Sequence, residues 1–250
     1  MLRLDGKVAV VTGGGSGIGK AIVSLFCAQG AFVHLIDVEP PGDLLSYGVG
    51  DQLKVHQCDV SDQKQVLEII QALPVLNILV NNAGIAHVGN VETTSTSDFD
   101  RLLNVNVKGV YNCLHAAIPL MKNNGGGAIV NMCSIAALLG IADRFAYSMT
   151  KGAVYSMTMS VAKDYLHHHI RCNSVSPARV HTPFVDGFIN KNYPGREAEM
   201  FEKLSKSQPI GRMGTVQEVA NMVLFLASDE AAFITGNDYL VDGGFMHLNG

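Results

Sequence analysis

The feature of the sequence that most constrains the fold is a regular alternation of short apolar runs with longer segments of helical periodicity. Continuous apolar runs of about five residues, without polar alternation, are typical of strands covered on both faces of a parallel sheet. No linker, repeat or low-complexity tract divides the chain. The pattern therefore predicts one α/β domain over residues 1–250. The predicted strands are 7–12, 32–36, 53–57, 77–80, 128–132, 170–175 and 239–241, and the predicted helices include 18–29, 63–73, 99–121, 147–165 and 216–227.

Composition excludes several classes of function. The chain has 18 basic and 22 acidic residues, a net charge of −4 and no basic stripe, so nucleic acid is not an expected partner. No apolar run reaches the roughly 18 residues that a membrane span needs, and the N-terminus carries no signal-peptide pattern. Five scattered cysteines without a CxxC pair favour reduced thiols and a cytoplasmic protein. The consecutive histidines 167–169 do not converge on one ion, so we predict no metal site.

A glycine-rich turn follows the first predicted strand. The run Thr12-Gly-Gly-Gly-Ser-Gly-Ile-Gly19 reads TGxxxGxG and opens the first predicted helix. Glycines let the backbone approach a pyrophosphate, which the positive end of a helix attracts. Asp37 ends the second predicted strand, where a carboxylate can accept the ribose hydroxyls and repel a 2′-phosphate. The turn by itself could also be plain punctuation, but together with Asp37 it favours NAD over NADP.

Two further strand ends carry polar residues. Asp59 and Val60 follow the third predicted strand, and the run Asn81-Asn82-Ala83-Gly84 follows the fourth. Ligands of open parallel sheets bind at the carboxyl ends of the strands. Both segments are therefore candidates for the same nucleotide site, with a plain turn as the alternative reading.

The acid–base candidates are Tyr147 and Lys151, with Ser134 upstream at a predicted strand end. Residues i and i+4 share one face of a helix, so the phenol and the ammonium lie side by side. A cation about 4 Å away, at an effective dielectric near 20, stabilises a phenolate by about 4 kcal/mol. A surface pair is the alternative for this spacing alone. With the nucleotide motifs upstream, we expect Tyr147 to exchange a proton while Ser134 binds the reacting oxygen.

Taken together, TGGGSGIG, NNAG, Ser134 and YSMTK resemble the classical short-chain dehydrogenases/reductases, over residues 6–244. The resemblance implies a Rossmann-like sheet of seven strands, a nicotinamide cofactor and a homotetramer. It also implies a tetrad of Asn106, Ser134, Tyr147 and Lys151, in which Asn106 keeps a water in the proton relay. The cofactor contacts that it implies are Gly13, Gly17, Ile18, Gly19, Asp37, Asp59, Val60, Asn82, Tyr147, Lys151, Val180 and Thr182.

The chain departs from the family pattern in two places. Pro177-Ala178-Arg179 stands where the family has Pro-Gly, and alanine disfavours a positive φ beside the nicotinamide. The connection after Asp37 is short and contains Pro40-Pro41-Gly42, which puts the usual helix there in doubt. The segment 182–208 lies outside the strand–helix alternation and has the length of a substrate lid.

Arg144, three residues before Tyr147, is the sharpest indication of substrate class. A guanidinium near the catalytic tyrosine offers a fork for a carboxylate, and the spacing resembles that of 2-keto-3-deoxy-L-fuconate and cytosolic 3-hydroxybutyrate dehydrogenases. Arg179 adds a second cationic group, although either arginine could instead be structural. We therefore expect an NAD-dependent alcohol dehydrogenase acting on a hydroxy acid or sugar acid. The alternatives are a neutral sugar or polyol dehydrogenase, such as an aldose 1-dehydrogenase, and a catalytically silent NAD-binding protein.

Overall fold

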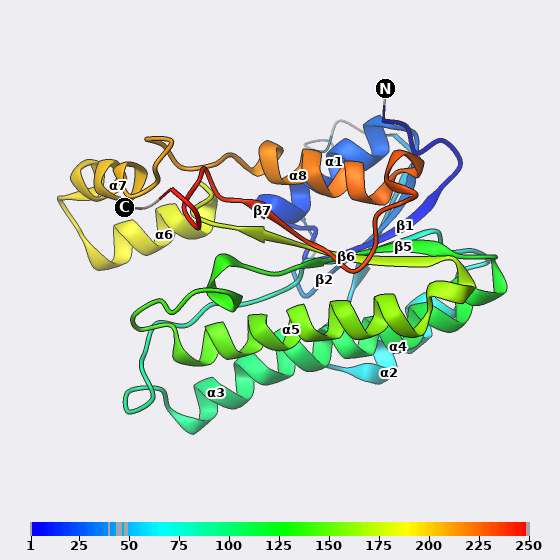
Figure 1. Ribbon diagram of the computed structural model, residues 1–250, viewed down its shortest axis with the longest axis horizontal. Coiled ribbons are helices and arrows are strands. Elements are labelled where there is room, and N and C mark those ends of the chain that lie inside the picture. Colours follow the sequence, from blue (N-terminus) through cyan, green and yellow to red (C-terminus); the bar gives the residue numbers. More distant parts are fainter. Residues whose placement is uncertain (1, 40, 44–46, 48–49, 249–250) are drawn as a thin grey trace.

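The computed structural model describes residues 2–39, 41–43, 47 and 50–248. Its centre is a seven-stranded sheet in the order β3-β2-β1-β4-β5-β6-β7, in which every neighbouring pair is parallel. Figure 1 shows this sheet between two layers of helices, which confirms the predicted Rossmann-like fold. The strands are β1 Val8–Thr12, β2 Phe32–Asp37, β3 Leu53–Gln57, β4 Ile78–Asn81, β5 Gly127–Met132, β6 Ile170–Pro177 and β7 Asp238–Val241.

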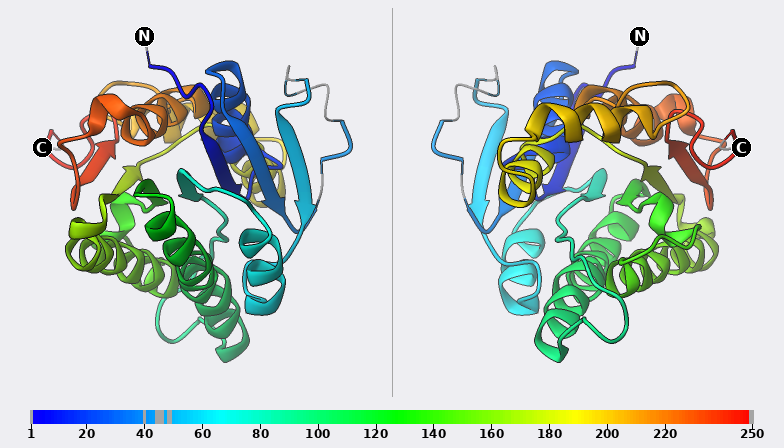
Figure 2. Two further views of the ribbon diagram at one scale, coloured as in Figure 1. Left: turned by 90° about the vertical axis from the view of Figure 1, so that its right-hand side faces the viewer. Right: turned by 90° about the vertical axis from the view of Figure 1, so that its left-hand side faces the viewer.

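Each face of the sheet has its own hydrophobic core. One core joins β1 and β2 to α1 (Gly17–Ala28) and α8 (Val216–Ala227). The other joins the sheet to α2 (Gln63–Gln71), α4 (Gly109–Asn123) and α5 (Phe145–Asp164). The views of Figure 2 agree with this division into two layers. Burial on both faces explains why the central strands are continuous apolar runs.

The predicted helix 99–121 is longer and less regular than expected. It begins with α3 (Thr96–Leu102), which Ser95 caps by accepting a hydrogen bond from the Asp98 N–H. The chain then passes through a π-helical segment, Leu103–Lys108, directly into α4. A π-helical turn widens the helix locally and is frequent at functional sites. The π-helical segment of this chain contains Asn106.

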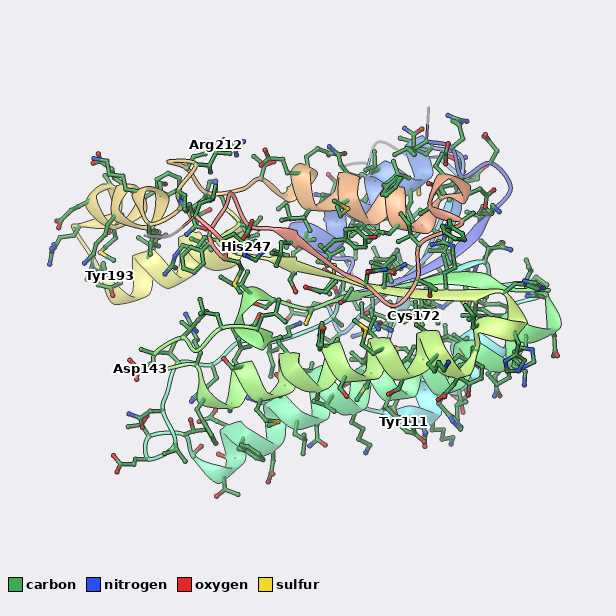
Figure 3. All side chains as sticks on the ribbon, viewed as in Figure 1. Tyr111, Asp143, Cys172, Tyr193, Arg212 and His247 are labelled. Atoms are coloured by element: carbon green, nitrogen blue, oxygen red, sulfur yellow. The ribbon has the colours of Figure 1, made fainter. Side chains whose placement is uncertain are left out.

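Two connections bear on the site. The described residues between β2 and β3 form no α-helix, in agreement with the doubt raised by the proline-rich sequence there, although Pro40 itself lies outside the described residues. The segment 182–208 forms two short helices, α6 (Pro183–Asn192) and α7 (Glu197–Lys206). Figure 3 shows Asp143, before α5, and Tyr193, after α6, at the same end of the molecule, whereas Cys172 on β6 lies away from that end, between the two layers of helices.

The strand order places the ligand-binding edge. The chain proceeds outward from β1 to β3 in one direction and from β4 to β7 in the other, so the connections diverge between β1 and β4. In open α/β sheets the crevice at such a switch point, beside the carboxyl ends of the strands, binds the ligand. Among the described residues, no helix is both long and apolar enough to cross a membrane.

Candidate active site

A cavity of about 780 Å³ opens at the carboxyl edge of the sheet. It runs from the glycine-rich turn and Asp37, past the end of β4, to the segment before α5 and the start of α6. Of the predicted site residues, all except Asn106 line it. These are Gly13, Gly17, Ile18, Gly19, Asp37, Asp59, Val60, Asn82, Ser134, Arg144, Tyr147, Lys151, Arg179, Val180 and Thr182.

The glycines of the turn are required by close approach. Gly13 has φ +64°, and a Cβ added to it would lie 2.7 Å from the Ala83 Cα. A Cβ on Gly19 would lie 2.0 Å from the Gly13 carbonyl oxygen. Side chains at these positions would push the turn away from the first turn of α1. The N-terminal end of that helix therefore opens on the cavity with its backbone N–H groups accessible to an anion.

Asn82 fixes this turn from the side of β4. Its amide nitrogen donates to the carbonyl oxygens of Thr12, at 3.0 Å, and Gly13, at 2.9 Å. The Thr12 hydroxyl in turn accepts the backbone N–H groups of Asn82 and Ala83. The sequence predicted Asn82 as a cofactor contact, and its hydrogen bonds show that it also ties the ends of β1 and β4 together.

Asp37 lies at the far end of the cavity from Tyr147, where the second strand ends. Its carboxylate accepts the Gly15 N–H at 2.8 Å and the Glu39 N–H at 3.2 Å. The carboxylate is thereby held beside the glycine-rich turn. An oxygen acceptor in this place suits the hydroxyl groups of a ribose and opposes a phosphate.

The Tyr147 and Lys151 side chains lie on one face of the first turns of α5. The ammonium nitrogen of Lys151 is 5.9 Å from the centre of the Tyr147 ring. It donates to the Met132 carbonyl oxygen at 2.7 Å, and the lysine is otherwise buried. This hydrogen bond to the last residue of β5 fixes the cation beside the phenol, and among the described residues no carboxylate pairs with it. The structure therefore places the ammonium and the phenol side by side, as expected for residues four positions apart on a helix.

Ser134 lies directly beyond β5, on the same wall of the cavity as Tyr147. Its backbone is extended and its hydroxyl oxygen accepts the Ala136 N–H at 3.2 Å. The hydroxyl hydrogen stays available for another acceptor in the cavity. The arrangement lets Ser134 donate to an oxygen held near the phenol.

Asn106 is the predicted site residue that the structure keeps off the cavity wall. It is buried, and its side chain exchanges two hydrogen bonds with the backbone of Ile85, at 2.8 and 2.9 Å. Its amide also donates to the Thr150 hydroxyl, which donates to the Tyr147 carbonyl oxygen. In this structure Asn106 therefore links the loop after β4 to the turn of α5 that carries Tyr147.

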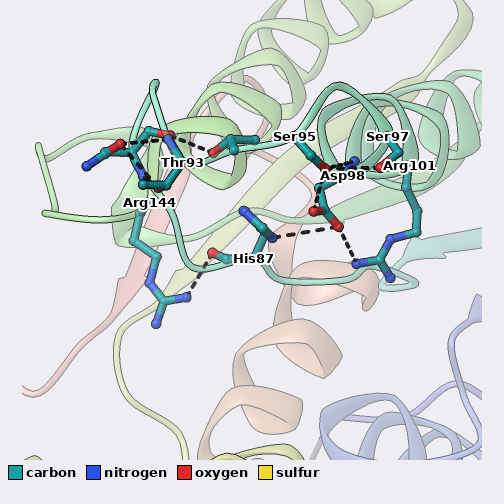
Figure 4. Close-up of polar contacts among 9 residues, drawn as sticks. His87, Thr93, Ser95, Ser97, Asp98, Arg101 and Arg144 are labelled. Carbon is teal, nitrogen blue, oxygen red and sulfur yellow. Dashed lines mark hydrogen bonds and ion pairs between the residues drawn. The ribbon is translucent and has the colours of Figure 1, made fainter.

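Arg144 comes from the segment before α5, which pairs with the loop 85–94. Gly89 forms an isolated parallel bridge with Arg144, and the Arg144 Nη1 donates to the His87 carbonyl oxygen at 3.0 Å. Figure 4 shows this contact beside the ion pairs of Asp98 with His87 and Arg101. Among the described residues no carboxylate pairs with Arg144, not even the adjacent Asp143.

Arg179 approaches the same part of the cavity from beyond β6. Its Nε donates to the Ser207 hydroxyl at 3.1 Å, at the end of α7. Desolvation by the surrounding protein lowers the pKa of Arg179, and the positive charge of Arg144 lowers it further. Its side chain contacts solvent through the open cavity, so the charge remains. The two guanidinium groups therefore face the same space, and the described part of the chain offers Arg179 no carboxylate partner either.

Sequence reasoning missed several residues of the cavity. Arg101 and Phe245 line it, from α3 and from the segment after β7. Arg101 pairs with Asp98 on α3, but the predicted helix began only at residue 99, so neither this pair nor the approach of Arg101 to the cavity was predicted. Ala178 does not adopt a positive φ, and its N–H donates to the Val241 carbonyl, which continues the pairing of β6 with β7.

Within the described residues no group of three His, Cys, Asp or Glu side chains could hold a metal ion.

Comparison with known proteins agrees with this geometry. Residues 13–246 match the family model described as enoyl-(acyl carrier protein) reductase. The chain is 37% identical to dehydrogenase/reductase SDR family member 6 of Aquarana catesbeiana, over 98% of this chain and 99% of the relative. It is 32% identical to 2-keto-3-deoxy-L-fuconate dehydrogenase of Xanthomonas campestris, over 98% of this chain and 82% of the relative.

Two solved structures extend the comparison. Ligand-free aldohexose dehydrogenase of Thermoplasma acidophilum has a TM-score of 0.89 and 36% identity, covering 98% of this chain and 95% of that one. ElxO with NADP bound has a TM-score of 0.87 and 31% identity, covering 96% of this chain and 98% of that one. The chain is therefore similar in sequence and in fold to proteins whose names give different substrates.

Proposed function

The chain belongs to the short-chain dehydrogenase/reductase family, and we propose that it interconverts a secondary alcohol and a ketone on a hydroxylated carboxylate with NAD. Membership of this family makes the protein an oxidoreductase that acts on CH–OH groups. The substrate class and the choice of NAD are our inference from the side chains that line the cavity.

The observation that carries the substrate class is the pair of guanidinium groups, Arg144 and Arg179. Two like charges are held near each other in the cavity without a carboxylate among the described residues. A carboxylate that enters this part of the cavity is attracted by both positive charges. A carboxylate accepts a bidentate pair of hydrogen bonds from a guanidinium. Arg144 precedes Tyr147 by three residues, so a carboxylate bound there places the rest of a small substrate beside the phenol.

The residues present fit a nicotinamide dinucleotide. Gly13 and Gly19 allow a close approach to the backbone, α1 points its N-terminal end at the cavity, and Asp37 provides the ribose acceptor. Such a cofactor supplies the hydride acceptor or donor when bound. Tyr147 exchanges a proton with the substrate oxygen, Ser134 donates to that oxygen, and Lys151 stabilises the phenolate while Met132 holds its ammonium.

The preference for NAD rests on Asp37. Its carboxylate is fixed by two backbone N–H groups, so it cannot turn away easily from a 2′-phosphate. Like charges at such a distance repel. Wild-type protein is therefore expected to have a higher kcat/KM with NAD than with NADP. In Asp37→Ala the ratio of these two kcat/KM values should be smaller. Equal kcat/KM for both cofactors in the wild type would contradict the proposal.

A neutral aldose or polyol is the second candidate substrate, favoured by the similarity to the aldohexose dehydrogenase. In this case Arg144 and Arg179 bind hydroxyl groups of the substrate or stabilise the fold. A silent NAD-binding protein is disfavoured, because Tyr147, Lys151 and Ser134 line one cavity.

The direct test is a substrate panel with purified protein and NAD at alkaline pH, following NADH formation. It should pair hydroxy acids and aldonic acids with neutral alcohols and aldoses of the same carbon skeleton. A charge-assisted hydrogen bond contributes about 1.5–3 kcal/mol, so the carboxylates should be favoured by about 10- to 150-fold in kcat/KM. Neutral sugars as the best substrates would replace the first candidate by the second.

We also propose a cytoplasmic homotetramer. The five cysteines are all buried free thiols, which agrees with a reducing compartment. Tyr111 on α4 and Phe145 on α5 expose large apolar surfaces on the same layer of helices, which agrees with subunit contacts there. Light scattering coupled to gel filtration measures the mass, and a monomer would contradict the assembly.

A further inference from the structure

Tyr47 is a buried tyrosine in the connection between β2 and β3, outside every motif of the site. It is 3% exposed and belongs to the core that joins β1, β2 and α1. Its hydroxyl donates to the Gly14 carbonyl oxygen at 2.9 Å. The ammonium of Lys20, in the first turns of α1, lies 5.1 Å from the centre of its ring. One side chain thus contacts both the glycine-rich turn and the helix that follows it.

The turn needs such support, because three successive glycines have little conformational preference of their own. Each glycine is fixed from a different direction. Asn82 binds the Gly13 carbonyl oxygen, and Asp37 binds the Gly15 N–H. Between them, the Gly14 carbonyl oxygen is held by Tyr47. The other two contacts come from strand ends, whereas Tyr47 comes from the connection between β2 and β3.

The Tyr47 hydroxyl remains a donor over a wide pH range. Burial raises the pKa of Tyr47 to about 12, and the negative charge of Asp37 acts in the same direction. The phenol therefore stays protonated at the alkaline pH at which alcohol oxidation is usually assayed. Its ring is anchored in the core, so the hydroxyl is presented to Gly14 in one position.

We propose that Tyr47 is a positioning residue for dinucleotide binding, which holds the glycine-rich turn in the conformation that receives the pyrophosphate. This rests on the proposed function only in the identity of the dinucleotide. When the Tyr47 hydroxyl is removed, the glycine-rich turn should adopt other conformations in a fraction of the protein molecules. The apparent dissociation constant then rises by the inverse of the competent fraction.

The test is Tyr47→Phe, which keeps the ring in the core and removes the one hydrogen bond. A neutral hydrogen bond contributes a net factor of about 2 to 12 in an equilibrium constant. The dissociation constant for NADH, measured by fluorescence titration, should therefore rise by up to about 12-fold. Amide hydrogen exchange of residues 13–17 in the protein without dinucleotide should become faster. The kcat at saturating NAD should not change.

Two controls separate positioning from general destabilisation. Tyr239→Phe changes a tyrosine that packs against the same core from β7, and should leave NADH affinity unchanged. Val223→Ala removes buried volume from α8 in that core, so it should lower Tm but leave the dissociation constant and the exchange of residues 13–17 unchanged.

Unchanged NADH affinity and unchanged exchange in Tyr47→Phe would overturn the proposal. An equal weakening by Val223→Ala would also overturn it, because the effect would then follow stability alone. If wild-type protein bound no NADH, the cofactor assignment would fail, and the exchange rates without dinucleotide would still decide whether Tyr47 holds the turn.

Discussion

The two halves of the cavity are built from different kinds of contact. The dinucleotide half is made by chain segments that adjacent strand ends deliver directly, the turn 12–19 and Asp37. The substrate half is lined by the loop after β4, the segment before α5 and the residues after β6. The first two meet at the bridge between Gly89 and Arg144, whereas Arg179 contacts Ser207 at the end of α7. The first half is shaped by close approach of the backbone at glycines, and the second is lined by charged side chains.

The two halves of the cavity therefore differ in the substitutions that they tolerate. In the dinucleotide half a single added Cβ would collide with backbone, as the distance of 2.0 Å at Gly19 shows. In the substrate half, replacing Arg144 or Arg179 removes a hydrogen bond to His87 or Ser207 but adds no atom that collides with backbone. Specificity can therefore vary on this scaffold while the nucleotide site stays the same.

The largest expected effect is at Tyr147, where the two halves meet. Tyr147→Phe keeps the ring and removes the titrating oxygen, so turnover should fall by about 10²- to 10⁴-fold, as is typical for the loss of a general acid–base group. The affinity for NADH, measured by fluorescence, should change little because the nucleotide half is untouched. Substantial turnover in this variant would remove Tyr147 from the mechanism.

Gly19→Ala tests the backbone-built half. The added Cβ would lie 2.0 Å from the Gly13 carbonyl oxygen, so the turn must move by about an ångström. The displacement takes backbone N–H groups away from the pyrophosphate, and the loss of one hydrogen bond to a charged group, about 1.5–3 kcal/mol, should raise the NADH dissociation constant by about 10- to 150-fold. Gly152→Ala in α5 is the matched control, since its Cβ meets nothing within 4 Å, and it should raise stability by about 0.5–1 kcal/mol. Equal NADH affinity in both variants would show that the turn tolerates side chains.

Arg144→Met tests the half built from side chains. It keeps the reach of the side chain without the charge, so a carboxylate substrate should lose about 10- to 150-fold in kcat/KM. The loss should appear mainly in KM if the contact is equal in ground and transition states. Activity on a neutral alcohol should be nearly unaffected. A similar loss on charged and neutral substrates would make Arg144 structural.

The smallest expected effect is a pH dependence of folding stability that arises in β2, the strand that ends at Asp37, and in β3. His34 on β2 and His56 on β3 share a hydrogen bond of 2.9 Å between ring nitrogens. Burial lowers the pKa of His34 to about 4, and the charges of His56 and Lys54 act in the same direction. Burial also lowers the pKa of His56, with Lys54 contributing.

Because the folded-state pKa of His34 lies below its ordinary value of about 6.5, its contribution to stability is complete above pH 6.5 and is lost as the pH falls toward 4. Each pH unit in that range should cost up to about 1.4 kcal/mol. Urea unfolding at pH 7.5 and 5.5 measures the difference, and it should be smaller in His34→Gln. Equal slopes in variant and wild type would assign the pH dependence to other groups.

The sequence predicted much of the fold because its signals are local. Six of the seven strands lie within one residue of the predicted bounds, since a strand buried on both faces needs a continuous apolar run. The run 99–121 was predicted as one helix, and only the structure shows the π-helical segment that turns Asn106 toward Ile85. Hydrophobic periodicity does not distinguish a π-helical turn within a longer helix.

What the sequence determined by itself is the alternation of strands and helices, the glycine-rich turn and the spacing of Tyr147 and Lys151. Each depends on the conformation of residues close together in the chain, which side-chain size and periodicity dictate. Only the tertiary structure decided that Arg144 and Arg179 face one cavity, that Asn106 lies behind its wall, and that Tyr47 holds Gly14. The residues in each of these pairs are 21 to 35 positions apart in the chain, and no sequence pattern relates them, because the packing of the sheet and its helices sets such distances.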